Sequence, residues 1–323
     1  MKAPDTDVLR EAIGHIFDRE VLSFHRHRSP YSSSFAIEEL DIRFPNRERI
    51  TVVFKNLGSE AILEEARSVR PAFLQNSLRE IQVYDKVLSL LNVGTPDLYG
   101  TVVDPSLGRY WLFIEKVPGI ELYQVGDFEV WLEAARWLGR FHSLEACNAG
   151  RALASVPALL QHSPAFYRTW LDRALISAGK SLEPVVQHYE RVLDVLDSLP
   201  VSIIHGEFYA ANILIQEDTG RRVCPVDWEM AAIGPGLLDV ANLASGKWTR
   251  EQRSRILDAY CSTLPGSARV KDLITAFDCC QLQVALQWLG WSVDWAPPPE
   301  HAHDWLAEVT QLCAEEPLRR LLR

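Results

Sequence analysis

The sequence lacks the features that mark several common classes of protein. Its 323 residues contain no apolar run long enough to cross a bilayer, and no internal repeat or low-complexity segment. The six cysteines lack the paired spacing of a metal site, and the N-terminus lacks the apolar core of a secretory leader. We therefore expect a cytoplasmic protein without a membrane anchor, in which all six cysteines are reduced thiols.

Positive charge is scarce relative to negative charge. Lysine and arginine total 33 residues against 43 aspartates and glutamates, which gives a formal net charge of −10. A general nucleic-acid-binding protein, or a protein held to anionic membranes, needs the opposite balance. We therefore expect no nucleic acid and no membrane as partner. The length is sufficient for two domains or one large two-lobed unit.

Short apolar runs in the second half of the chain predict a strand followed by a hairpin. Val201–Ile204 is rich in β-branched residues, as is typical of a buried strand, and it ends at a His-Gly pair where a turn is expected. Two further apolar runs, 213–215 and 223–226, flank the turn residues 217–220. This pattern predicts a loop after the first strand and then a two-stranded hairpin.

Polar side chains lie on both sides of this hairpin. His205, Glu207 and Asn212 fall in the loop before it, and Asp227 falls at the exit of its second strand. Carboxylate and carboxamide oxygens suit Mg²⁺, which prefers one or two carboxylates together with phosphate oxygens. Protein kinases use the same order of a carboxylate, an asparagine five positions later and an aspartate after the hairpin. The stretch therefore indicates Mg²⁺-dependent phosphoryl transfer.

These motifs resemble those of the aminoglycoside phosphotransferase and choline kinase families. The run HGEFYAAN at 205–212 is similar to their HGDxxxxN motif, and DWE at 227–229 is similar to their DxD-type motif. The continuation GPGLLD at 234–239 also resembles these families. They are small-molecule kinases with a protein-kinase-like fold. The resemblance implies an α+β fold of two lobes, with an antiparallel-sheet nucleotide-binding lobe over 1–117 and a mainly helical catalytic and substrate-binding lobe over 118–323.

The resemblance also implies roles for the motif residues. Glu207, which stands where the families usually have aspartate, would take the proton of the attacking hydroxyl group, and His205 would support the loop. Asn212 and Asp227 would hold Mg²⁺, and Asp239 would be structural, near the start of a helix. Glutamate is longer than aspartate by one methylene, and a misplacement of about 1 Å can cost on the order of 100-fold in rate. Two interpretations stay open: a working base, or a loop carboxylate in an inactive relative.

The first part of the chain resembles the nucleotide-binding lobe of these kinases. A strand over Arg49–Phe54 ends at Lys55, which by resemblance contacts the nucleotide phosphates. A helix is expected over 72–91, and its Glu80 would be the carboxylate that fixes Lys55. The run Ser32-Ser33-Ser34 stands where the families have a glycine-rich loop over the phosphates. It is interpreted either as a phosphate-cradling loop or as an ordinary turn.

Other segments have a structural interpretation. His25–Arg28 is interpreted as a solvated basic segment, and His142 as a packed histidine at the end of a helix over 128–144. Glu229 is interpreted as a support for the metal ligands or as a surface group. A long apolar helix is expected over 277–291.

The C-terminal part is unusually aromatic. Its indoles either fill a helical core or form a wall against the substrate; they are Trp288, Trp291, Trp295 and Trp305. In the family, acidic residues of this region often bind the substrate, and no motif selects among the three candidates here, Asp294, Glu300 and Asp304.

The expected activity is transfer of the γ-phosphoryl group of ATP or GTP to a hydroxyl group of a small molecule. An antibiotic, as in antibiotic resistance, an amino alcohol, a sugar and a biosynthetic intermediate all fit as acceptor. Two alternatives stay open: a pseudokinase that binds Mg-nucleotide without transfer, and a nucleotidyl transferase on the same scaffold. The sequence does not decide between a monomer and a dimer.

Overall fold

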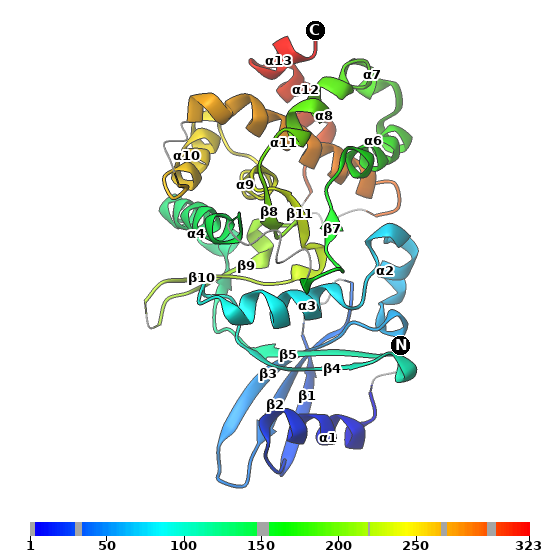
Figure 1. The fold of residues 1–323 in the computed structure, drawn as a ribbon, viewed down its shortest axis with the longest axis vertical. Helices are drawn as coiled ribbons and strands as arrows, with labels where there is room; N and C mark the ends of the chain where they lie inside the picture. The colour runs from blue at the N-terminus through cyan, green and yellow to red at the C-terminus, as the bar shows by residue number, and fades with distance from the viewer. Residues whose placement is uncertain (1–3, 30–33, 147–154, 219, 266–269, 296–301) are drawn as a thin grey trace. The chain divides into compact units, whose positions relative to one another are not determined.

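The computed structural model describes residues 4–29, 34–146, 155–218, 220–265, 270–295 and 302–323 (Figure 1). The chain divides into two compact units. The first contains residues 1–119 and 216–229, and the second contains residues 120–215 and 230–323. The sequence placed the whole of 216–229 in its second domain. The hydrogen bonds of Asp227, Trp228 and Glu229 to side chains of the first unit explain this difference.

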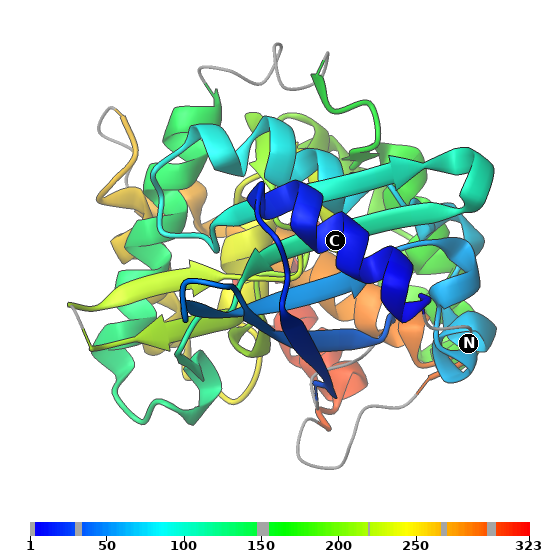
Figure 2. The same cartoon turned by 90° about the horizontal axis from the view of Figure 1, so that it is seen from below.

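The first unit is built on a five-stranded antiparallel sheet with strand order β1-β2-β3-β5-β4. Leu40, Ile42, Val52 and Phe54 alternate along β2 and β3 onto one buried face, as period-2 strands require. Helix α1 adds Leu9 and Ile13 to this core and lies across the sheet in Figure 2. The elements of this unit are α1 (Thr6–Phe17), β1 (Ser23–Arg28), β2 (Ile37–Arg43), β3 (Arg49–Asn56), α2 (Glu64–Val69), α3 (Arg79–Lys86), β4 (Leu98–Asp104), β5 (Arg109–Glu115) and β10 (Arg222–Pro225).

One expectation for this unit is incomplete and one is wrong. His25, His27 and Arg28 are exposed, as expected of a solvated segment, but His25–Arg28 also forms most of the edge strand β1, where Arg26 pairs with Glu38 of β2. The helix expected over 72–91 is broken into a 3₁₀ turn at Ala72–Leu74, α3 and a second 3₁₀ turn at Leu88–Leu90. The Asn76 side chain accepts from the N–H of Leu78, and such a local bond favours a turn over a continuing helix.

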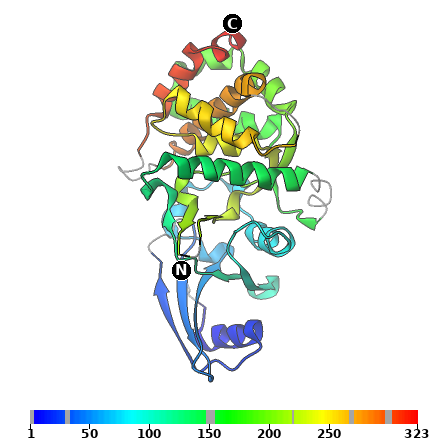
Figure 3. The same cartoon turned by 90° about the vertical axis from the view of Figure 1, so that its left-hand side faces the viewer.

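The second unit is mainly helical, with α11 packed against α6, α9 and α12. Figure 3 shows α4 and α10 side by side, in agreement with their contacts. The helices are α4 (Phe128–Ala146), α6 (Pro164–Ala178), α7 (Glu183–Val186), α8 (Tyr189–Asp197), α9 (Leu237–Leu243), α10 (Arg250–Cys261), α11 (Val270–Trp291), α12 (Trp305–Ala314) and α13 (Leu318–Leu321). The short strands are β6 (Ile120–Glu121), β7 (Leu160–Gln161), β8 (Val201–Ile204), β9 (Ile213–Gln216) and β11 (Ala232–Pro235).

Strand β8 leads into the predicted catalytic loop. It pairs antiparallel with β11, and β11 pairs in parallel with β7. The strand predicted at 201–204 and the helices predicted at 128–144 and 277–291 are confirmed by β8, α4 and α11. No helix in the described part of the chain is long and apolar enough to cross a membrane. The five described cysteines are free thiols; Cys147 lies outside the described residues.

Candidate functional site

The first unit brings Lys55 together with two carboxylates. Lys55 Nζ, at the end of β3, donates to Glu80 Oε1 of α3 at 2.7 Å and to Asp227 Oδ1 at 2.8 Å. The N–H of Trp228 also donates to Glu80 Oε1, at 3.3 Å. The side chains of Lys55 and Glu80 are buried, whereas that of Asp227 keeps 24% of its surface exposed. One ammonium group is thus fixed between a buried carboxylate and a partly exposed one.

Burial and charge act against each other in this cluster. Burial disfavours the charged form of Lys55, but the attraction of Asp227 and Glu80 outweighs it and raises the pKa of Lys55. Burial raises the pKa of Glu80 to about 7; Lys55 opposes this shift and the charge of Asp227 adds to it. Glu80 Oε2 has no hydrogen-bond partner among the described residues, which makes the ionised form of Glu80 costly. Lys55 is therefore charged, and the charge of Glu80 changes near neutral pH.

Asp227 has an unusual backbone conformation. Its φ angle is +65°, in the left-handed region that side-chain-bearing residues enter infrequently. Such a conformation costs on the order of 1–3 kcal/mol and persists only where surrounding contacts fix it. Contacts at all three positions of the Asp227-Trp228-Glu229 segment meet this requirement.

A second ion pair lies beside this cluster. Arg70 donates to Glu229 Oε1 at 2.9 Å and to Ser34 Oγ at 2.7 Å, and Ser34 Oγ donates to Glu229 Oε1 at 2.8 Å. Ser34 therefore hydrogen-bonds to both members of this ion pair. Ser32 and Ser33 lie outside the described residues. Arg70 belongs to no motif in the sequence, and no signal there identifies it.

A cavity of about 220 Å³ with a mixed polar and apolar wall lies in the first unit beside these side chains. Arg70, Glu80 and Glu229 line it, together with hydroxyl, amide and apolar side chains. Arg79 is buried nearby, and burial together with the charge of Arg70 lowers the pKa of Arg79 to about 10. Lys55 thus pairs with the carboxylates of Glu80 and Asp227. Arg70 pairs with that of Glu229, and Arg79 donates to the main-chain carbonyl oxygen of Glu229.

The second unit holds the predicted catalytic loop. His205 is fully buried at the end of β8, and its Nδ1 accepts from the N–H of Glu207 at 3.3 Å. The side-chain amide of Asn212 donates to the carbonyl oxygen of Glu207 at 3.1 Å. The asparagine therefore fixes the backbone of the glutamate, and its orientation is fixed in return.

Asp239 holds this loop from α9. Its carboxylate accepts from the N–H groups of His205 at 2.7 Å and Gly206 at 2.9 Å, and His142 Nε2 lies 3.3 Å from it. From the sequence, we expect a structural role for Asp239 and a packed position for the His142 side chain. Both are buried in the structure, and His142 also lies 3.2 Å from the hydroxyl of Tyr260.

Aromatic side chains of the second unit gather next to the loop. Trp288 stacks on Trp305 with centroids 5.3 Å apart, and Tyr209 of the loop lies 5.8 Å from Trp288. Trp295 lies 6.1 Å from Trp288, whereas Trp291 packs separately on Trp170. The sequence identified the tryptophans but did not connect them to Tyr209.

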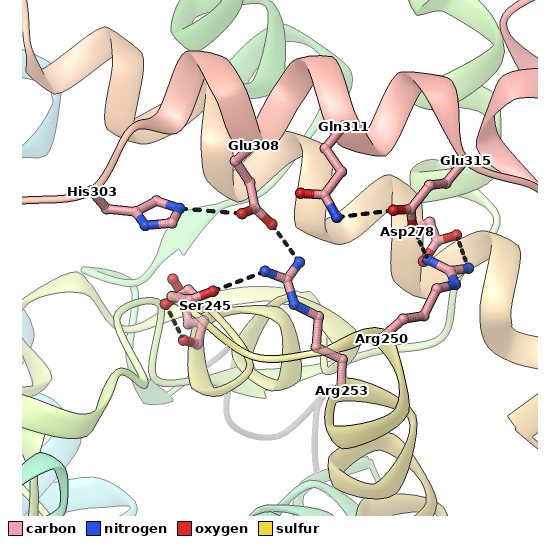
Figure 4. A network of polar contacts seen from close by, with 10 residues as sticks. Ser245, Arg250, Arg253, Asp278, His303, Glu308, Gln311 and Glu315 are labelled. Atoms are coloured by element: carbon pink, nitrogen blue, oxygen red, sulfur yellow. Dashed lines mark hydrogen bonds and ion pairs between the residues drawn. The ribbon is translucent and has the colours of Figure 1, made fainter.

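The acidic candidates of this region have other partners. Asp294 pairs with Arg173, and Asp304 caps α12 by accepting from the N–H of Ala307. Glu300 lies outside the described residues. Figure 4 shows that Glu308 of α12 pairs with Arg253 of α10 and with His303. The two described candidates, Asp294 and Asp304, thus have structural partners within the second unit.

The side chains expected to bind a metal do not form a cluster of one ligand type. Within the described residues, no three histidine, cysteine, aspartate or glutamate side chains gather as a metal site. Mg²⁺ is usually bound by one or two carboxylates and substrate phosphates, so it does not need such a cluster. The carboxylate of Asp227 and the carboxamide of Asn212 are hard oxygen donors of the kind that Mg²⁺ prefers.

These two units together define a class of protein. An antiparallel-sheet unit that fixes a strand lysine by a helix glutamate, followed by a helical unit whose loop carries a carboxylate and an asparagine five positions later, is typical of protein-kinase-like enzymes. The chain belongs to the phosphotransferase enzyme family, which it matches over residues 51–273. A search of curated proteins finds no match.

Solved structures of small-molecule kinases share the fold. A choline kinase from Cryptosporidium parvum Iowa II is 18% identical, with 98% of each chain covered and a TM-score of 0.66. A putative aminoglycoside phosphotransferase from Ralstonia eutropha JMP134 is 16% identical, with 98% of this chain and 96% of that chain covered and a TM-score of 0.62. An amicoumacin kinase in complex with AMP-PNP and Ca²⁺ is 9% identical, with 99% and 93% covered and a TM-score of 0.60. The predicted α+β, protein-kinase-like fold is confirmed.

Proposed function

We propose that the protein transfers the γ-phosphoryl group of ATP or GTP to a hydroxyl group of a small molecule. The observation that carries the proposal is the pair of bonds from Lys55 Nζ to Glu80 and to Asp227. Phosphoryl-transfer enzymes of this class use such a lysine to bind nucleotide phosphates and such an aspartate to bind the metal. Membership of the phosphotransferase family supports the same reaction.

Asp227 and Asn212 are the residues that would hold Mg²⁺. The Asp227 side chain is partly exposed, so its carboxylate is accessible to a metal ion. The bond from the Asn212 side-chain nitrogen to the carbonyl oxygen of Glu207 fixes the direction of the Asn212 side-chain oxygen. Mg²⁺ would supply charge neutralisation on the phosphates. Lys55, held by Glu80, would bind the same phosphates as a fixed cation.

Glu207 is the base in this proposal. It would orient the acceptor hydroxyl group and take its proton as the oxygen attacks the γ-phosphorus, which leaves ADP or GDP as the other product. His205 and Asn212 fix the backbone of Glu207 from either side. Most of the rate enhancement then comes from positioning and charge stabilisation.

The acceptor is a small hydroxyl-bearing molecule. The structural neighbours include kinases named for choline, aminopropanol and amicoumacin. Amino alcohols, aminoglycosides, other hydroxylated antibiotics and sugars are therefore the classes to test, with antibiotic resistance as one biological setting. A cytoplasmic location and a monomeric or dimeric state stay predictions of the sequence.

The test is a nucleotide-turnover screen with Mg-ATP and Mg-GTP against a panel of these acceptors. Thermal shift measures binding, and separate assays measure ADP or GDP and pyrophosphate. Glu207→Gln is the matched control, because it removes the base and keeps its shape. Acceptor-dependent ADP or GDP release that disappears in the control supports the proposal.

Each rival function has its own outcome in this screen. Release of pyrophosphate instead of a nucleoside diphosphate overturns the proposal in favour of nucleotidyl transfer. Stabilisation by Mg-nucleotide, without release for any acceptor and without a difference between wild type and Glu207→Gln, favours the pseudokinase.

A further inference from the structure

Three consecutive residues, 227–229, hydrogen-bond to four different parts of the first unit. Asp227 accepts from Lys55 of β3, and the N–H of Trp228 donates to Glu80 of α3. Glu229 accepts from Arg70, which follows α2, and from Ser34. The segment 227–229 therefore links β3, α3, the residue after α2 and the end of the serine run.

The bonds at Glu229 form a closed triangle. Ser34 Oγ and Arg70 both donate to Glu229 Oε1, and Arg70 donates to Ser34 Oγ as well. The side chains of Arg70 and Glu229 are 6% and 11% exposed, so this charge-assisted pair is shielded from solvent. A serine hydroxyl has one donor and two acceptor sites, and Ser34 uses the donor and one acceptor here. A glycine at position 34 would have neither.

The backbone of Glu229 is held separately. Arg79 donates to the carbonyl oxygen of Glu229 at 2.7 Å and to that of Leu74 at 3.0 Å. The main chain at 229 is thus fixed to the turn before α3 whatever its side chain does. This bond allows the carboxylate to be changed without releasing the segment.

We propose that Glu229 is a positioning residue: with Arg70 it ties Ser34 to the segment that carries Asp227, and it does not bind the metal. The inference rests on the proposed function, because it assigns the triangle to nucleotide binding. Binding a metal through Oε1 would displace two donors and separate a buried ion pair, which is strongly unfavourable, so only Oε2 could reach a metal without breaking the triangle. As a positioning residue, it uses all three bonds as they stand, while the Arg79 bond to its carbonyl oxygen holds the main chain next to Asp227.

The tie has a consequence for the nucleotide site. Ser34 ends the run that the sequence places over the phosphates, and its carbonyl oxygen accepts from the N–H of Leu63 at 3.0 Å. Loss of the triangle would leave Ser34 attached through its main chain only. We expect weaker binding of the nucleotide phosphates, with the affinity for Mg²⁺ itself unchanged.

The experiment compares Glu229→Ala, Arg70→Ala and Ser34→Ala with the control Glu48→Gln, which alters an exposed ion pair with Arg19 in the same unit. Glu229→Gln keeps the shape of the side chain and serves if the alanine variant does not fold. Nucleotide affinity, the Mg²⁺ concentration for half-maximal turnover and amide exchange at Leu63 are measured for each protein.

The expected result separates a tie from a metal ligand. Glu229→Ala and Arg70→Ala each weaken nucleotide binding by about tenfold, the size of one lost charge-assisted contact. In the double variant Glu229→Ala/Arg70→Ala, the loss of nucleotide-binding free energy is smaller than the sum of the two single losses, because both substitutions remove the same interaction. Ser34→Ala changes affinity in the same direction, Mg²⁺ half-saturation stays within about twofold, and Glu48→Gln has no effect.

Other outcomes overturn the inference. A tenfold rise in Mg²⁺ half-saturation for Glu229→Gln, without one for Arg70→Ala, would make Glu229 a metal ligand. Unchanged nucleotide affinity in both alanine variants removes the positioning role. If the wild-type protein binds no Mg-nucleotide, the proposed function fails together with the nucleotide part of the inference. Amide exchange at Leu63 still tests in that case whether Glu229 and Arg70 position Ser34. Faster exchange in Glu229→Ala and Arg70→Ala supports this role, and unchanged exchange refutes it.

Discussion

The main-chain N–H of His205 donates to Asp239 Oδ2 at 2.7 Å, across 34 residues of sequence. The N–H of Gly206 donates to the other carboxylate oxygen at 2.9 Å, so both oxygens of Asp239 are used on the turn before Glu207. Asp239 is fully buried, and these amides lose their acceptors if the carboxylate is removed. The carboxylate on α9 thus fixes the position from which the proposed base acts.

Replacement of Asp239 by asparagine should therefore destabilise the protein. An asparagine amide nitrogen presents hydrogens to one of the two N–H donors, and a buried bond of this kind is worth about 2–4 kcal/mol when only one partner is lost. Urea unfolding of Asp239→Asn should show this loss of unfolding free energy, and kcat should fall with it. Asp197→Asn, at an exposed position of α8, is the control and should change stability by less than about 0.5 kcal/mol. Equal effects of the two substitutions would contradict this role of Asp239.

Gly206 is required for two separate reasons. Its φ angle is +85°, and a Cβ atom there would lie 2.3 Å from the carbonyl oxygen of Met230. Gly206→Ala should cost on the order of 3 kcal/mol, since the left-handed backbone and the overlap with a main-chain atom both count. Gly108→Ala isolates the first cause, because φ is +63° there and nothing lies within 4 Å of the added Cβ. Thermal unfolding should show a clearly larger loss for Gly206→Ala, and similar losses would mean that Met230 moves away.

The length of Glu207 is the sharpest feature to test in the proposed reaction. His205 and Asn212 fix the backbone of Glu207, so an aspartate there would place its carboxylate about 1.5 Å short. We expect Glu207→Asp to lower kcat by about 10- to 100-fold, although it restores the residue that the related families usually have. Glu207→Gln should lower kcat by about 100- to 10,000-fold with nucleotide affinity unchanged. A faster Glu207→Asp enzyme would show that this loop is not adapted to glutamate.

The sequence predicts those parts of the site that depend on local spacing. A β-branched run, a His-Gly turn and two apolar runs suffice to predict β8 and to place His205, Glu207, Asn212 and Asp227 around a hairpin. The strand that carries Lys55 is predicted because it is rich in apolar and β-branched residues, of which Val52 and Phe54 lie on one buried face.

Contacts between distant residues leave no such pattern. Arg70 and Glu229 are separated by 159 positions, and neither the spacing nor the composition near Arg70 indicates a buried ion pair. The helix expected over 72–91 fails because apolar residues at helical spacing also fit a turn-helix-turn segment, once the Asn76 side chain accepts from the N–H of Leu78. Strand β1 is missed because charged side chains at a sheet edge hide the strand pattern.

The raised pKa of Glu80 predicts how stability depends on pH. Burial raises this pKa from 4.5 to about 7, so between these values the folded state keeps a proton that the unfolded state has lost. Stability contributed by this group is therefore present below pH 4.5 and is lost as the pH rises through 7. Glu80→Gln cannot ionise, so urea unfolding at pH 5, 6, 7 and 8 should show wild type losing unfolding free energy relative to this variant, by an amount on the order of 1–3 kcal/mol. The opposite trend would mean that attraction to Lys55 outweighs burial and that the pKa of Glu80 lies below its usual value.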